Sequence, residues 1–168
     1  MNNKGKVIAL CGKIASGKTY YANKLKEQEN AVIFSVDELT YYLYDNRRGE
    51  DYRNITKRAL NYFRTKAIDI VNRGITVIID SGLWSLEARK EMKDFFINTG
   101  IKCEIHYIDI DDESWENNIN KRNHRIDEGD IGTDFYVTDS LKALLLESWQ
   151  EPNKEEIDVW YKFKNEEE

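Results

Sequence analysis

The sequence contains few cysteine, histidine and proline residues, and these shortages exclude several classes of protein. Its 168 residues include two cysteines, two histidines and one proline. Cys11 and Cys103 both lie in apolar runs, which favours buried free thiols in a reducing compartment over a disulfide framework or a metal site. Two histidines, His106 and His124, are too few for a metal cluster. Pro152 lies near the end, and the chain has neither an internal repeat nor a low-complexity linker.

Long apolar runs are also missing. No stretch approaches the length that crosses a bilayer, and Met1–Lys6 lacks the apolar core and cleavage site of a signal peptide. We therefore expect a cytoplasmic protein that does not associate with a membrane. The net charge of −6 argues against a broad basic face that binds duplex nucleic acid, but it does not exclude a local basic groove.

The length and composition predict one compact domain over residues 1–168. Hydrophobic residues make up 40% of the chain and charged residues 33%, which is typical of a globular protein with a full core. The oligomeric state cannot be deduced from these values.

The most specific feature of the sequence is a phosphate-binding loop. Residues 12–19 read G-K-I-A-S-G-K-T, which fits the pattern G-x-x-x-x-G-K-[ST]. The loop joins an apolar run, Val7–Cys11, to a helical segment, Tyr20–Glu29, so that successive backbone N–H groups can point at one anion. In such a loop Lys18 reaches the β- and γ-phosphates, and the Thr19 hydroxyl takes one site on Mg²⁺. The predicted nucleotide-binding residues are Gly12, Lys13, Ile14, Ala15, Ser16, Gly17, Lys18 and Thr19.

Apolar strands alternate with amphipathic helices along the rest of the chain. This order predicts an α/β fold, in which a parallel sheet is covered by helices on both faces and ligands bind beyond the carboxyl ends of the strands. The predicted strands are Lys6–Cys11, Ala31–Ser35, Ile75–Ile79, Ile101–Ile110 and an alternating segment from Ile157 to Phe163. The predicted helices are Tyr20–Glu29, Leu39–Tyr44, Tyr52–Asn72, Glu87–Asn98, Trp115–Arg122 and Leu141–Trp149.

Two carboxylates follow predicted strands and are candidates for the chemistry. Asp37 comes just after Ala31–Ser35, where it either accepts a proton from an attacking hydroxyl or caps the following helix. Asp80 ends the next strand, where P-loop proteins place a carboxylate near the metal, usually through water. A hydrogen bond to the acceptor and a cap near Ser85 are the alternatives for Asp80.

Two arginines at the start of a polar segment are candidates for charge stabilisation. Arg122 and Arg125 lie in K-R-N-H-R, and we expect residues 123–138 to form a mobile lid loop. Both side chains could neutralise charge on the transferred phosphoryl group, or simply end a helix in solvent. Thr40–Arg53, rich in tyrosine and arginine, and Trp84 either wall an acceptor pocket or form ordinary half-buried surfaces.

With these motifs assembled, residues 6–150 resemble a broad family of P-loop kinases. The family includes polynucleotide 5′-hydroxyl kinases, chloramphenicol phosphotransferase and zeta-toxin-type kinases. The shared motifs are the phosphate loop, F-S-V-D-E-L with Asp37, V-I-I-D with Asp80, K-R-N-H-R, and L-L-E-S-W-Q-E-P. The resemblance implies a three-layer fold with a five-stranded parallel sheet in the order 2-3-1-4-5 and a small lid. It also implies Asp37 as general base, Arg122 and Arg125 on the phosphates, and Thr19 on Mg²⁺.

One departure from the family bears on the acceptor. Polynucleotide kinases carry an arginine three residues after the catalytic aspartate, and Thr40 stands there in this sequence. Together with the net negative charge, this favours a small-molecule acceptor over a nucleic acid. Arg47, Arg48 or Arg53 could replace the missing arginine. The sequence therefore predicts an ATP- and Mg²⁺-dependent kinase with Lys18, Asp37, Arg122 and Arg125 as catalytic residues and Thr19 and Asp80 at the metal. A polynucleotide 5′-hydroxyl kinase and a non-catalytic ATP-binding regulator are the alternatives.

Overall fold

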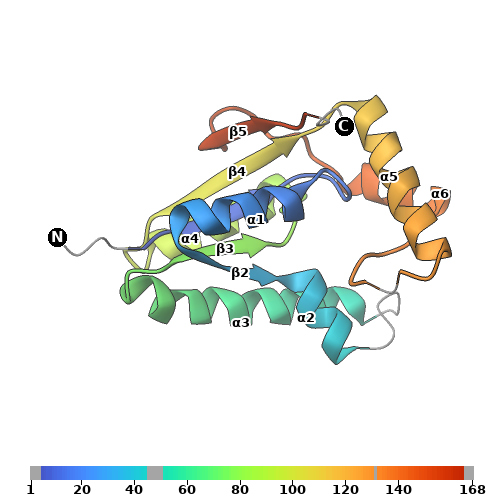
Figure 1. The fold of residues 1–168 in the computed structure, drawn as a ribbon. Coiled ribbons are helices and arrows are strands. Elements are labelled where there is room, and N and C mark those ends of the chain that lie inside the picture. The colour runs from blue at the N-terminus through green and yellow to red at the C-terminus, as the bar shows by residue number, and fades with distance from the viewer. Residues whose placement is uncertain (1–4, 45–50, 131, 165–168) are drawn as a thin grey trace.

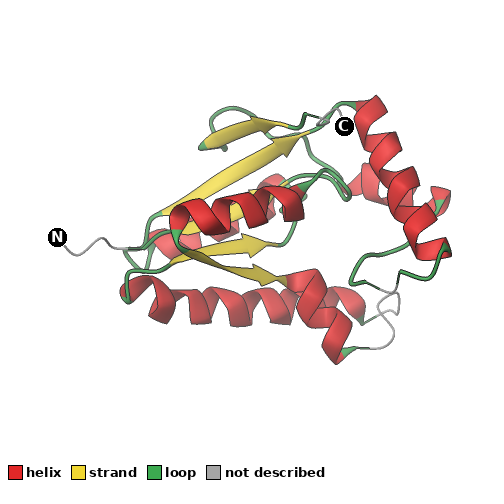
Figure 2. Cartoon of the chain, in the orientation of Figure 1, coloured by secondary structure: helices red, strands yellow, loops and turns green. Residues whose placement is uncertain are grey.

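A five-stranded parallel sheet organises the chain, which a computed structural model describes at residues 5–44, 51–130 and 132–164 (Figures 1 and 2). The strand order is β2-β3-β1-β4-β5, as the resemblance implies, and the predicted α/β class is confirmed. The strands are β1 Val7–Cys11, β2 Ala31–Ser35, β3 Thr76–Asp80, β4 Cys103–Asp109 and β5 Val159–Lys162. The helices are α1 Lys18–Glu29, α2 Val36–Leu43, α3 Tyr52–Asn72, α4 Leu86–Ile97, α5 Asp112–Asp127 and α6 Asp139–Ser148.

Helices cover both faces of the sheet because the side chains of each central strand point alternately to opposite sides. On β1, Val7 and Ala9 pack with α3 and α4, whereas Ile8 and Leu10 pack with α1. All four of these side chains are fully buried. The continuous apolar run of β1 is therefore explained by its position at the centre of a three-layer structure.

The register of the strands brings three carboxyl ends together at one edge of the sheet. Leu10 of β1 and Ser35 of β2 both pair with Asp80 of β3. The phosphate loop, the start of α2 and Asp80 consequently emerge next to one another. Helices α5 and α6 lie beyond this edge, away from the body of the sheet (Figure 1).

Several helices begin earlier than the sequence predicts, and the differences at α2 and α5 affect the site. Helix α2 begins at Val36 instead of Leu39, because the Ser35 side chain accepts a hydrogen bond from the Glu38 N–H at 3.2 Å and caps the helix. Helix α5 continues to Asp127, so the prediction of a loop from Asn123 is wrong, and residues 128–130 and 132–138 of the connection to α6 are not helical. Within the described residues, no helix is both long enough and apolar enough to cross a membrane.

Candidate active site

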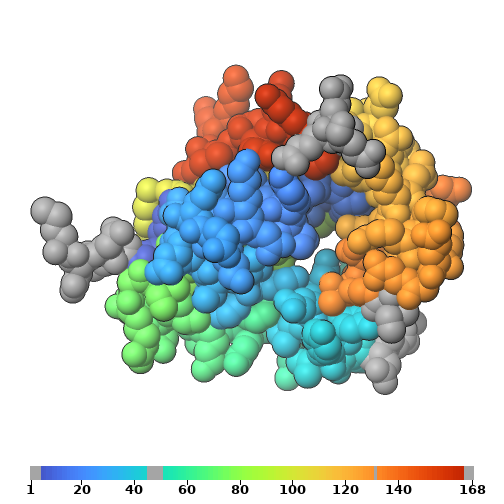
Figure 3. Space-filling view, in the orientation of Figure 1, coloured from blue at the N-terminus to red at the C-terminus, as the bar shows by residue number. Residues whose placement is uncertain are grey.

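A cleft of about 880 Å³ lies at the carboxyl edge of the sheet, bounded by the phosphate loop, α1, α2 and α5. Figure 3 shows the surface hollowed between these segments. Its lining includes all six residues predicted to act in catalysis or at the metal: Lys18, Thr19, Asp37, Asp80, Arg122 and Arg125. These residues come from four elements, α1, α2, β3 and α5, and the fold alone brings them together.

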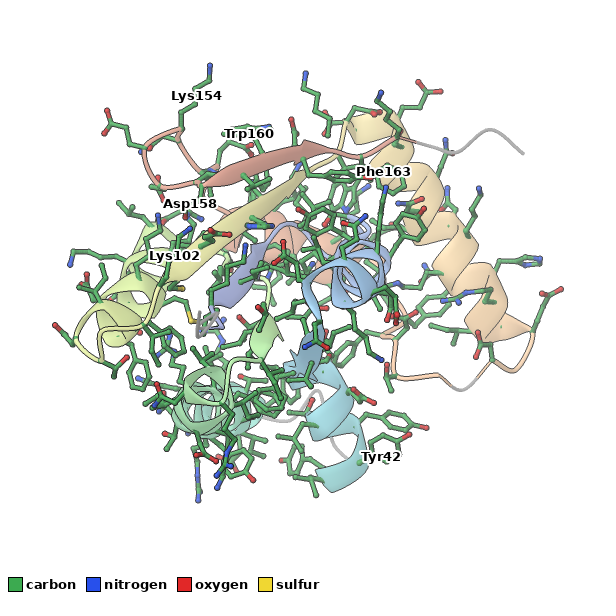
Figure 4. The ribbon with its side chains drawn as sticks, turned by 60° about the vertical axis from the view of Figure 1, so that its left-hand side comes forward. Tyr42, Lys102, Lys154, Asp158, Trp160 and Phe163 are labelled. Carbon is green, nitrogen blue, oxygen red and sulfur yellow. The ribbon has the colours of Figure 1, made fainter. Side chains whose placement is uncertain are left out.

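The phosphate loop turns sharply into α1 at Gly17. This residue has a φ of +92°, in the left-handed region that favours glycine, and it occupies the N-cap position of α1. The ring of Phe163, which follows β5, lies against it, and a Cβ at position 17 would come within 2.8 Å of two ring carbons (Figure 4). Within the loop, the Ser16 hydroxyl is buried without a hydrogen-bond partner among the described residues. A cradle of this kind, which a Cβ would disturb and which holds an unpaired polar group, fits a bound phosphate.

Lys18 lies across the loop that carries it. Its ammonium group donates hydrogen bonds to the carbonyl oxygens of Gly12 at 3.1 Å and Lys13 at 2.7 Å. Burial lowers the pKa of Lys18, and the carboxylates of Asp80 and Asp37 oppose that shift. The cation is therefore held in the loop, close to both candidate carboxylates.

Thr19 and Asp80 lie side by side at the floor of the cleft. The two side chains are joined by a hydrogen bond. Burial raises the pKa of Asp80, whereas the Lys18 ammonium group and this hydrogen bond lower it. A hydroxyl beside a carboxylate is a donor set that suits Mg²⁺, which takes one or two protein oxygens and completes its shell with phosphate and water. The alternative of a cap near Ser85 is wrong, because the Ser85 hydroxyl itself accepts from the Ala88 N–H at 3.1 Å.

Asp37 lies in the first turn of α2 and lines the cleft. The alternative that it caps this helix is wrong, since Ser35 is the capping residue. The backbone of this turn is held by Thr40, whose hydroxyl donates to the Asp37 carbonyl oxygen at 3.1 Å. Asp37 thus reaches the cleft from a helix with a fixed start.

One carboxylate that the sequence analysis missed, Asp134, binds both lid arginines. Its two oxygens lie 3.2 Å from Arg122 Nη2 and 2.7 Å from Arg125 Nη2. Arg125 also lies 3.5 Å from Asp130. Both arginines belong to α5, whereas Asp134 belongs to the following loop, which gives no sequence signal of its position.

Two further residues of α5 that the sequence analysis missed bind the phosphate loop. The Trp115 indole N–H donates to the Ile14 carbonyl oxygen at 2.7 Å. The Asn118 amide donates to the Ala15 carbonyl oxygen at 2.9 Å. Helical spacing could have placed them, because positions 115, 118, 122 and 125 recur every three or four residues and share one face of the helix.

The aromatic residues proposed as an acceptor wall do not line this cleft. Trp84 packs edge-on against Trp149, with ring centroids 5.4 Å apart. Tyr42 projects from α2 with 73% of its surface exposed and borders only a shallow groove with Phe63 (Figure 4). Arg53 is exposed in the first turn of α3 and does not line the cleft either. Arg47 and Arg48 lie outside the described residues.

In comparisons with known proteins, one family model matches this chain and many solved structures resemble it. The sequence profile of a family described as an AAA domain matches residues 7–142. A search of curated proteins finds no match. The APS kinase CysC of Mycobacterium tuberculosis, solved with AMPPNP and APS, is similar with a TM-score of 0.68 and 17% identity, over 95% of this chain and 88% of that chain.

Two other solved structures are similar at comparable identity. Kti12 of Chaetomium thermophilum in complex with ADP-AlF3 gives a TM-score of 0.69 at 16% identity, over 96% of this chain and 90% of that one. A gluconokinase of Sinorhizobium meliloti 1021 gives 0.58 at 12% identity, over 95% and 82%. At these identities the likeness shows the fold alone.

Proposed function

This chain belongs to the AAA domain family, and from that premise we propose that it is an ATP-dependent kinase that transfers the γ-phosphate to a hydroxyl of a small molecule. The observation that carries the proposal is the composition of the cleft. A phosphate loop with its lysine, a carboxylate on α2 and two arginines on α5 all line one cavity. Phosphoryl transfer requires these groups, because its catalysis consists mainly of positioning and charge stabilisation.

Each residue has a role that follows from its chemistry. The loop amides and Lys18 bind the β- and γ-phosphates, and Arg122 and Arg125 neutralise charge that develops on the transferred group. Asp37 accepts the proton of the attacking hydroxyl. Thr19 and Asp80 would hold Mg²⁺, which would supply positive charge against the phosphates.

The acceptor is a small hydroxyl compound in this proposal. APS kinase and gluconokinase, whose folds the chain shares, carry small molecules in their names, which supports this class. Thr40 also supports a small-molecule acceptor. Its buried hydroxyl donates a hydrogen bond to the Asp37 carbonyl oxygen and lies 3.3 Å from the Tyr52 hydroxyl. A threonine bonded in this way replaces the arginine that grips the substrate phosphate in polynucleotide kinases.

The first test is a search for the acceptor. A thermal-shift screen of metabolites, nucleosides and antibiotics with a non-hydrolysable ATP analogue should reveal compounds that raise the melting temperature only when nucleotide is present. Each hit is then tested as an acceptor of labelled γ-phosphate from ATP, alongside 5′-hydroxyl oligonucleotides. Transfer to an oligonucleotide alone would replace the small-molecule proposal, and an absence of any ATP binding would refute the kinase itself.

The second test separates the roles of Lys18 and Asp37. Lys18→Ala should reduce transfer by about a thousand-fold or more, because it removes the charge on the transferred group. Asp37→Asn should reduce the turnover number by about a hundred-fold or more while the dissociation constant of ATP stays within about two-fold. Glu38→Gln, which removes a carboxylate from the same turn of α2, is the matched control. Full turnover in Asp37→Asn would remove the assignment of the general base.

A further inference from the structure

Ala15 has an unusual backbone for a residue with a side chain. Its φ is +57°, in the left-handed region, whereas the other residue of the phosphate loop with a clearly left-handed backbone is Gly17. For an alanine this conformation is unfavourable relative to the right-handed one. It persists only where surrounding contacts hold it.

Two side chains of α5 hold the peptide groups on either side of Ala15. Trp115 donates to the carbonyl oxygen of Ile14, which belongs to the peptide group before the Ala15 Cα. Asn118 donates to the carbonyl oxygen of Ala15, which belongs to the peptide group after it. Peptide groups are planar, so fixing the direction of both carbonyls fixes the φ and ψ angles between them.

Trp115 is itself firmly placed. It is only 4% exposed and packs in a cluster with Ile110 and Ile119. The ammonium groups of Lys13 and Lys142 lie 4.9 and 5.2 Å from the centre of its ring. The start of α5 is thus a fixed base from which both hydrogen bonds reach the loop.

We propose that Trp115 and Asn118 are positioning residues for nucleotide binding, which hold Ala15 in its left-handed conformation and so keep the phosphate loop in its binding shape. In a trans peptide the N–H points away from the C=O. Holding the Ile14 carbonyl toward α5 therefore turns the Ala15 N–H to the opposite side. This inference rests on the proposed function only in taking the bound anion to be a nucleotide phosphate.

The proposal makes a prediction about nucleotide affinity. We call the two hydrogen bonds from Trp115 and Asn118 the clamp. Without the clamp, Ala15 relaxes toward right-handed conformers. The apparent dissociation constant of the nucleotide then rises in inverse proportion to the fraction of molecules in which Ala15 is left-handed. Asn118→Ala should therefore weaken binding of the magnesium complex of AMPPNP about ten-fold by calorimetry. Asn117→Ala, at the exposed neighbouring position, is the matched control and should bind like the wild type.

A second substitution distinguishes positioning from direct contact, because Asn118 also lines the cleft. Glycine adopts the left-handed conformation without strain. In an Ala15→Gly background, Asn118→Ala should therefore weaken binding by no more than about two-fold. An equal loss in both backgrounds would mean that Asn118 contacts the nucleotide itself, and no loss in either would also overturn the proposal. Trp115→Phe, which keeps a ring but removes the N–H, should follow the same pattern.

A measurement without nucleotide tests the clamp separately from the kinase. Asn118→Ala should lower the melting temperature of the free protein by about 3 °C in the Ala15 background and by clearly less in the Ala15→Gly background. Should the wild type bind no nucleotide, the proposed function fails, while this thermal comparison still decides whether the clamp holds Ala15. Equal shifts in both backgrounds would refute the clamp.

Discussion

Two carboxylates in this molecule are each shared by several cations, and they differ in burial. Glu104 on β4 binds Lys6 at 3.0 Å, Lys102 and His106, with 13% of its side chain exposed. Asp134 in the loop after α5 binds Arg122 and Arg125, with 37% of its side chain exposed. The first group lies against the sheet beneath α1, and the second lines the cleft.

This difference in burial indicates that the ion pairs of Glu104 are structural, whereas those of Asp134 can be exchanged for other partners. Removing one partner from a buried group of charges leaves the others desolvated and uncompensated, which is costly. An ion pair as exposed as that between Asp134 and Arg125, whose side chain is 53% exposed, contributes little, because water and salt screen it. Glu104 therefore stabilises the fold, whereas Asp134 holds two arginines by contacts that a phosphate could replace.

The most direct test of this difference between Glu104 and Asp134 is to substitute each carboxylate by alanine. Glu104→Ala should lower the free energy of unfolding by about 3 kcal/mol, because Lys6 and His106 each lose one of two partners in a buried setting, Lys6 keeping Glu29 and His106 keeping Tyr21. Asp134→Ala should lower it by at most about 1 kcal/mol. Urea unfolding measures both, and similar losses for the two variants would contradict the distinction.

Acid should remove the contribution of Glu104 in a defined range of pH. Burial alone would raise the pKa of Glu104, but hydrogen bonds from Lys102, Lys6 and His106 lower it from 4.5 to about 2. The unfolded chain then binds more protons between these values, so stability is complete above about pH 4.5 and falls as the pH drops toward 2.

This dependence is tested by unfolding between pH 6 and pH 2. The difference in stability between the wild type and Glu104→Gln should shrink by about 2–3 kcal/mol over that interval. Glu27→Gln, which changes an exposed carboxylate of α1, should leave the slope unchanged. A constant difference between wild type and Glu104→Gln would show that the cluster does not depress this pKa.

The smallest expected effect concerns Asp134 and the nucleotide. If a phosphate must displace Asp134 from the arginines, Asp134→Asn should tighten binding of AMPPNP about three-fold, because the competing charge is gone. Calorimetry at low and high salt measures this, and the advantage should diminish at high salt. Weaker binding in this variant would mean instead that Asp134 orients the arginines for the phosphates.

The sequence predicted the α/β class and the six candidate residues that line the cleft from local signals, whereas the strand order was implied by the family resemblance. The spacing of Gly12, Gly17 and Lys18 sets the phosphate loop by itself, and the apolar runs of β1 and β3 allow only a buried parallel sheet. Asp37 and Asp80 were found for the same reason, since each follows directly from the end of its strand.

The errors arise where contacts between distant segments decide the structure. The polar residues from Asn123 onward suggested a loop, yet α5 continues to Asp127 because Asp111 caps its start and Trp115 and Ile119 anchor one face. The ion pair between Asp134 and Arg122 could not be predicted from the sequence, because it depends on the path of the chain between them. Trp84 does not form part of an acceptor wall, because it packs instead against Trp149, which is far along the sequence.

The contact between Phe163 and Gly17 has a consequence for synthesis of the chain. Gly17 is translated early, yet the ring that covers it comes after β5, and the Phe163 N–H bonds the Asp109 carbonyl at 2.7 Å. A nascent chain on the ribosome can assemble β1, β3 and β4 long before this ring has left the exit tunnel. The phosphate loop should therefore reach its final packing at Gly17 only after Phe163 has emerged from the tunnel.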